Sequence, residues 1–217
     1  MNLPSKFAAA VQQLPLIAIL RGLTPAQAPG IGEALVHSGF ALLEVPLNSK
    51  QALDSIALLE HAHPRTVVGA GTVLSAAQVR DVHAAGGRLV VSPNFDAEVV
   101  RAALQLGLVC LPGVLTPSEA FAALALGAHG LKLFRAEMAS PAALKALRAV
   151  LPAATLVFPV GGITQGNMAL WLAAGANGFG IGSALYSPAK SAAAVREHAS
   201  GFVTAFRAAA STEVSKP

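Results

Sequence analysis

Apolar runs of strand length recur along the chain, and an Ala/Leu-rich stretch with helical spacing follows each of them. The runs begin about 20 to 26 residues apart, which is the spacing of strand–helix units joined by short loops. Because they are apolar throughout, they favour a parallel sheet that is covered by helices. The eight predicted strands are Leu16–Arg21, Leu42–Asn48, Thr66–Thr72, Leu89–Asn94, Leu108–Gly113, Gly130–Phe134, Thr155–Gly162 and Gly178–Ser183.

Residues typical of helix ends separate these strands. Cap residues precede several of the predicted helices, at Thr24-Pro25, Ser75, Thr116-Pro117, Ser140-Pro141 and Ser187-Pro188. Glycines end several of them, at Gly39, Gly86, Gly107, Gly127 and Gly175. A further amphipathic helix is predicted near Pro4 to Gln13. Eight such units predict a compact (β/α)8 barrel, a TIM barrel with a short N-terminal helix. We expect one domain over residues 1–217, with a flexible C-terminal tail from about residue 211.

The main alternative for the fold is an open, doubly wound sheet. Such a sheet is expected to carry a glycine-rich nucleotide-binding turn after its first strand. The first strand here ends instead in Leu20-Arg21-Gly22, and no linker or change of composition divides the chain. The barrel is therefore the favoured architecture.

Composition narrows the class of protein. The chain is 54% hydrophobic and only 12% charged, which excludes disorder as its main state. The net charge is +4 and the basic residues are scattered, so a nucleic-acid partner is not expected. The single cysteine, Cys110, lies in an apolar run and suits a reducing cytoplasm. No signal-peptide pattern is visible at the N-terminus, and no apolar stretch reaches the roughly 20 residues of a membrane span. We expect a soluble, cytoplasmic protein.

Two charged residues lie inside the predicted strands, Glu44 in the second and Lys132 in the sixth. In a (β/α)8 barrel the chemistry lies at the C-terminal ends of the strands, where polar residues also gather here, beginning with Arg21 at the end of the first strand. Alternation places Lys132 and Phe134 on one face of their strand. A desolvated lysine lowers its pKa and becomes a nucleophile toward carbonyls. A lysine that extends to solvent at the strand end is the alternative. Opposite charges within one barrel favour function, because an apolar pair would be about as stable.

Glycines follow the last two predicted strands, at Gly161-Gly162 and Gly182-Ser183. They can be tight turns alone, but the loops after strands seven and eight form the usual phosphate site of such barrels, and we favour phosphate. The pair His61 and His63 lies at a helix end on the opposite face and is interpreted as a solvated helix end. With no histidine among the strand-end residues, a metal is disfavoured.

At this point the chain resembles a known family, the class I 2-keto-3-deoxy-6-phosphogluconate/galactonate aldolases, from Leu16 to about Tyr186. The ordered set of motifs is specific, although each alone is weak. It comprises Ile19-Leu20-Arg21-Gly22, Glu44-Val45-Pro46-Leu47-Asn48-Ser49, Gly69-Ala70-Gly71-Thr72-Val73-Leu74, Ser92-Pro93-Asn94, Leu111-Pro112-Gly113, Leu131-Lys132-Leu133-Phe134 and Val160-Gly161-Gly162-Ile163-Thr164.

The resemblance implies a lyase with a (β/α)8 barrel, usually a homotrimer, that works through a Schiff base and needs no metal or cofactor. Lys132 would form the Schiff base and Glu44 would be the acid/base. The remaining implied residues would bind substrate: Arg21 and Thr72 its polar groups, Pro93 and Phe134 the pocket wall, Val160 the region near C4, and Gly161, Gly162, Gly182 and Ser183 the phosphate.

Two positions bear on the branch of the family. Gluconate-type enzymes typically have arginine where this chain has Asn48 and threonine where it has Val160, so the chain resembles the galactonate branch. The implied reaction is cleavage of 2-dehydro-3-deoxy-6-phosphogalactonate to pyruvate and D-glyceraldehyde 3-phosphate, in galactonate degradation of the Entner–Doudoroff type. Arg135 departs from both branches, which usually have proline there. It could add to anion binding or pair with Glu137.

Three alternatives stay open at the level of sequence. The nearest is an aldolase for the gluconate epimer or for 4-hydroxy-2-oxoglutarate. A phosphosugar isomerase or epimerase on the same barrel would use Glu44 as a base and Lys132 only for its charge. A metabolite-binding barrel without catalytic activity is the third.

Overall fold

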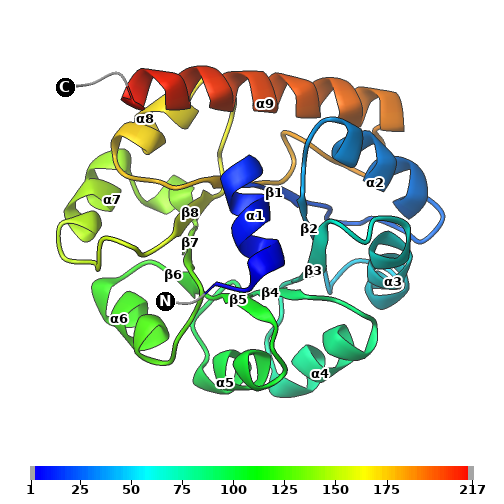
Figure 1. Cartoon of the computed structure of the whole chain (residues 1–217), viewed down its shortest axis with the longest axis horizontal. Coiled ribbons are helices and arrows are strands. Elements are labelled where there is room, and N and C mark those ends of the chain that lie inside the picture. Colours follow the sequence, from blue (N-terminus) through cyan, green and yellow to red (C-terminus); the bar gives the residue numbers. More distant parts are fainter. Residues whose placement is uncertain (1–2, 215–217) are drawn as a thin grey trace.

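The computed structural model describes residues 3–214 and shows a ring of parallel strands enclosed by helices (Figure 1). The strands are β1 (Leu16–Ile19), β2 (Leu42–Pro46), β3 (Val67–Gly71), β4 (Leu89–Val91), β5 (Val109–Leu111), β6 (Gly113–Val114), β7 (Leu131–Phe134), β8 (Val157–Val160) and β9 (Phe179–Ile181). The helices are α1 (Ser5–Gln13), α2 (Ala28–His37), α3 (Ala52–Ala62), α4 (Ala76–Ala84), α5 (Ala97–Gln105), α6 (Pro117–Ala125), α7 (Pro141–Arg148), α8 (Met168–Ala173) and α9 (Ala192–Val214), with a short 3-10 helix η1 (Ala136–Met138). The predicted N-terminal helix is confirmed as α1.

The sheet runs in the order β5-β4-β3-β2-β1-β9-β8-β7-β6, and neighbouring strands pair in parallel. Its two ends, β5 and β6, are consecutive pieces of one predicted strand that is interrupted at Pro112. The Pro112 carbonyl still accepts a hydrogen bond from the Lys132 N–H at 2.9 Å, so contact with β7 continues across the interruption. The ring is thereby closed, and the (β/α)8 prediction is confirmed.

Alternating side chains divide the interior into two apolar clusters. One lies between strands and helices, and the other fills the barrel with residues such as Ile17, Leu42 and Phe158. Phe7 of α1 is fully buried in the inner cluster and closes the end at which the strands begin. Solvent therefore reaches the barrel interior from the other end, where the strands finish.

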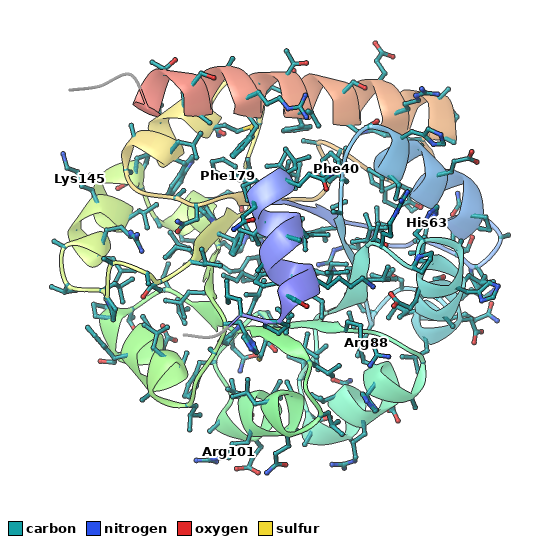
Figure 2. All side chains as sticks on the ribbon, in the orientation of Figure 1. Phe40, His63, Arg88, Arg101, Lys145 and Phe179 are labelled. Atoms are coloured by element: carbon teal, nitrogen blue, oxygen red, sulfur yellow. The ribbon has the colours of Figure 1, made fainter. Side chains whose placement is uncertain are left out.

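The charged surface lies outside the ring of helices. Figure 2 shows Arg101 and Lys145 projecting outward, whereas Phe40 and Phe179 lie within the ring. Charged side chains whose pKa burial changes are therefore expected inside the barrel, toward its mouth, and not on this outer surface.

The predicted helix ends are mostly confirmed. All five predicted terminal glycines adopt positive φ, between 69° and 98°, which side chains other than glycine rarely tolerate. Three predicted caps accept a backbone N–H in the expected way: Ser75, Thr116 and Ser140. The other two predicted caps, Thr24 and Ser187, were wrong. Helix α2 begins only at Ala28, and α9 begins at Ala192, where Ser191 accepts the Ala194 N–H.

The C-terminal helix α9 lies beside α2 and α8 (Figure 1). The tail that we expected from about residue 211 is helical as far as Val214, and residues 215–217 lie outside the described part of the chain. None of the helices in residues 3–214 has the length and hydropathy needed to cross a membrane.

Candidate active site

Lys132 points into the barrel from β7. Its neighbours Leu131 and Leu133 belong to the outer cluster, and Lys132 itself is 6% exposed. The Nζ atom lies 4.4 Å from the centroid of the Phe134 ring, close enough for a cation–π interaction. Burial lowers the pKa of Lys132 below its usual range, because the ammonium has lost most of its hydration. The structure thus presents an amine that is biased toward its neutral, nucleophilic form.

Glu44 points into the same barrel from β2 and is 2% exposed. Its carboxylate lies against Gly71 of β3, where a methyl group would overlap Oε1. Burial raises the pKa of Glu44, while the positive charges of Lys132 and Arg21 oppose that rise. The carboxyl group can therefore occupy this position only because residue 71 is glycine and has no side chain.

The two buried groups influence each other without direct contact. The negative charge of Glu44 raises the pKa of Lys132, but burial is the larger effect on both groups. In the described part of the chain, no ion pair of 4.0 Å or less joins them. A carboxyl and an amine that both favour their neutral forms can exchange protons with a ligand placed between them.

A pocket of about 610 Å³ opens at the mouth, beside the ends of β1, β8 and β9. Six residues predicted from the sequence line it: Arg21, Val160, Gly161, Gly162, Gly182 and Ser183. Arg21 is held there by a 2.9 Å hydrogen bond from its Nη1 to Oδ1 of Asn48. The structure thus brings the implied phosphate residues together with Arg21.

The remaining predicted residues do not line this pocket. Lys132 and Glu44 lie deeper, and strand register links them to it: Glu44 pairs with Ile19, which lines the pocket, and Phe134 pairs with Val160. Pro93 packs its backbone against Gly113, the residue that pairs with Lys132 on the other side. The site is therefore a pocket with a buried floor.

Thr72 follows Gly71 with φ of 57°, in the left-handed region. This conformation is a clear outlier for a β-branched residue and costs about 1–3 kcal/mol. Strain of this kind concentrates at functional sites, and here it lies next to the glycine that accommodates Glu44.

Hydrogen bonds from residues that sequence analysis missed hold the mouth loops. Asn167 donates to the Gly162 carbonyl at 2.8 Å, and Ser49, 8% exposed, accepts the Gly22 N–H at 2.8 Å. The Lys190 ammonium donates to the carbonyls of Ser183, Ala184 and Leu185, each at 3.2 Å. Ser49 lies within the Glu44–Ser49 motif, so the sequence did hold a signal for it. Lys190 lies outside the motifs of the family resemblance, and its contacts with residues 183–185 depend on the conformation of the loop between them.

The histidines and the cysteine noted in the sequence lie elsewhere. Within residues 3–214 no group of three or more His, Cys, Asp or Glu side chains is placed to hold a metal ion. Cys110 is in the outer cluster, where burial raises the pKa of its thiol to about 12. Its N–H donates to Nδ1 of His129 at 3.1 Å, so His129 has a structural contact before β7.

The electrostatic coupling predicts a measurable shift. The reactivity of Lys132 toward acetic anhydride, followed by peptide mass spectrometry against pH, should rise through an inflection below 10.5. In Glu44→Gln the inflection should move lower still, because the carboxylate that raises the Lys132 pKa is gone. Lys145, on the outer surface, is the internal reference and should react identically in both proteins. An inflection that moves upward in the variant would contradict this electrostatic coupling.

Comparison with known proteins agrees with this geometry. Residues 7–197 match the family model described as KDPG and KHG aldolase. The chain is 47% identical to the probable 2-dehydro-3-deoxy-6-phosphogalactonate aldolase of Rhizobium meliloti, over 89% of this chain and 92% of the relative. It is 44% identical to the 2-dehydro-3-deoxy-6-phosphogalactonate aldolase of Escherichia coli, over 91% and 97%. A solved structure described as native KDPGal superimposes with a TM-score of 0.91 at 42% identity, covering 97% of this chain and all of that one.

The match covers most of the chain and includes the two strands that carry the buried amine and carboxyl group, on a barrel of the same shape. The chain therefore belongs to the KDPG and KHG aldolase family.

Proposed function

We propose that this aldolase cleaves 2-dehydro-3-deoxy-6-phosphogalactonate to pyruvate and D-glyceraldehyde 3-phosphate through a Schiff base on Lys132. The observation that carries the proposal is the desolvated amine of Lys132, whose pKa burial lowers, in one barrel with Glu44. The names of the two relatives at 47% and 44% identity support the galactonate substrate.

The reaction begins at the C2 ketone. Neutral Lys132 attacks this carbon, and the resulting carbinolamine loses water to give a protonated Schiff base. The C4 hydroxyl then gives up its proton, the C3–C4 bond breaks, and its electrons enter the cationic imine to form an enamine. Glyceraldehyde 3-phosphate leaves. Protonation of the enamine at C3 and hydrolysis release pyruvate and restore the amine.

Glu44 carries the protons in this scheme, directly or through one water. Burial raises its pKa, which makes the carboxylate a stronger base for a group that must both accept and return a proton. Because the protonated imine itself accepts the electrons, the reaction requires no metal. Arg21 and Thr72 are proposed to hold the polar groups of the substrate, and Pro93 and Phe134 to form the wall around C2 and C3.

The phosphate is proposed to bind at the mouth. Gly161 and Gly162 both have positive φ, which turns successive peptide groups and lets the backbone approach an anion closely. The Lys190 ammonium donates hydrogen bonds to the three carbonyls of residues 183–185, so these acceptors are satisfied and a positive charge lies beside the loop proposed to bind the anion. With the sugar acid extended from Lys132 toward these loops, its phosphate would lie at the solvent end.

Trapping with borohydride tests the covalent step. Incubation of the protein with pyruvate and borohydride should add a reduced pyruvyl group to Lys132, located by peptide mass mapping. The labelling and the cleavage activity should both survive a strong chelator. Labelling of another residue, or activity that a divalent ion restores after chelation, would refute this mechanism and favour an isomerase or a metal enzyme.

Val160 is the position at which epimer preference is tested. It is 7% exposed at the pocket and packs against Gly180, so it offers no hydrogen bond to the C4 hydroxyl. The galacto epimer should be cleaved at least as well as the gluco epimer. Val160→Thr should shift the ratio of kcat/KM values toward gluco by several-fold to about tenfold, the value of one hydrogen bond of about 0.5–1.5 kcal/mol. A wild-type protein strongly selective for gluco would end the galactonate assignment.

We also propose a cytoplasmic homotrimer. Its buried thiol suits a reducing compartment, and an apolar groove of about 410 Å³ beside α6 and α7 offers a surface for a second copy. Leu115 and Val150 line this groove and are 38% and 57% exposed. Contact with a second copy would remove their apolar surface from water.

Light scattering after size exclusion should give three times the 21.9 kDa of one chain. Ala146→Glu, in the groove, should dissociate the trimer because it buries an unpaired charge in the interface. Ala142→Glu, exposed on the same helix but outside the groove, is the matched control and should leave it intact. A trimer that tolerates Ala146→Glu would place the interface elsewhere.

A further inference from the structure

Three charged side chains line the pocket at the mouth: Arg21, Arg135 and Glu137. Arg21 follows β1, whereas Arg135 and Glu137 follow β7, so the loops after β8 and β9 lie between them in the order of the sheet. Arg135 donates from Nε and Nη2 to Oε2 of Glu137, at 2.8 and 2.6 Å. The pocket therefore carries two cations, one of which is partly neutralised.

Glu137 lies against the loop that is proposed to hold phosphate. A methyl group on Gly162 would come within 2.8 Å of Glu137 Cγ, and one on Gly161 within 3.4 Å of its Oε2. A free carboxylate here would repel an anion in the loop. Arg135 compensates that charge, and a guanidinium has five N–H donors, so donors remain after the contacts with Glu137.

We propose that Arg135 and Glu137 together set the preference of this pocket for a phosphorylated over an unphosphorylated substrate. Arg135 is the cation that meets the phosphate, and Glu137 is the anion that limits its strength. This inference rests on the proposed function and adds to it two residues to which the family resemblance assigned no binding role. The alternative is that Arg135 and Glu137 form a surface ion pair with no role in binding.

The exposure of the pair makes it testable without loss of the fold. Arg135 and Glu137 side chains are 56% and 44% exposed, and ion pairs between exposed groups contribute little to stability. A matched control exists on α5, where Arg101 pairs with Glu98 at 2.6 Å with exposures of 52% and 75%. Figure 2 shows Arg101 at the outer edge of the molecule, and it does not line the pocket at the mouth.

The test measures the Kd of inorganic phosphate by calorimetry at fixed ionic strength. Arg135→Met should raise this Kd about tenfold, the loss of a charge-assisted hydrogen bond. Glu137→Gln should lower it several-fold, because the guanidinium charge is no longer offset. Arg101→Met and Glu98→Gln should change nothing. An unchanged Kd in Arg135→Met, weaker binding in Glu137→Gln, or no phosphate binding to the wild-type protein would overturn the proposal.

The preference for a phosphorylated substrate can also be measured kinetically. In the aldol addition to pyruvate, kcat/KM for glyceraldehyde 3-phosphate relative to glyceraldehyde should fall about tenfold in Arg135→Met and rise in Glu137→Gln. Pyruvate labelling of Lys132 separates this test from that of the proposed function, because pyruvate has no phosphate. Labelling should be equal in the wild type and Arg135→Met. If the wild type is not labelled, the aldolase mechanism fails, while the phosphate Kd values still decide the role of the pair.

Discussion

The desolvation of one amine and one carboxyl group inside the same barrel is the constraint on which the site depends. Removing charged groups from water favours their neutral forms, so the pKa of Lys132 falls and that of Glu44 rises. The fold tolerates both because Gly71 leaves room for the carboxyl group and the Phe134 ring faces the ammonium. Burial of these groups would be a cost to stability in a purely structural barrel, and in the proposed mechanism it is the source of reactivity.

That desolvation depends on the barrel being closed at one end. Phe7 of α1 and the inner apolar cluster fill the barrel below the two groups, so water and ligands approach from the ends of the strands. The mouth is correspondingly polar and is built on loops, yet hydrogen bonds from Asn167, Lys190 and Ser49 hold those loops. In the proposed function, hydrogen-bonded loops at the mouth above buried side chains at the floor would orient a long substrate with its reacting carbon inside and its charged end outside.

Charge is distributed along this axis in a consistent way. The floor has one amine and one carboxyl group, for both of which burial favours the neutral form, whereas the pocket at the mouth has the two arginines and Glu137. Arg21, at the mouth, also affects the two buried groups, because its positive charge lowers the pKa of both Lys132 and Glu44. The mouth and the floor are therefore electrostatically coupled, and a change of charge at one level is felt at the other.

The sequence alone predicted the class of fold and placed one charged residue in each of two strands, and the structure shows both of these side chains buried. Continuous apolar strands, terminal glycines and strand-to-strand spacing are local properties, and a charge within an apolar strand is visible without coordinates. The tertiary structure decided the rest. Pro112 divides one strand in two, Thr24 and Ser187 do not cap helices, and Lys190 reaches back to the 183–185 turn. These outcomes depend on the backbone conformation that packing imposes at the ends of strands and helices, and a local pattern of residues does not fix that conformation.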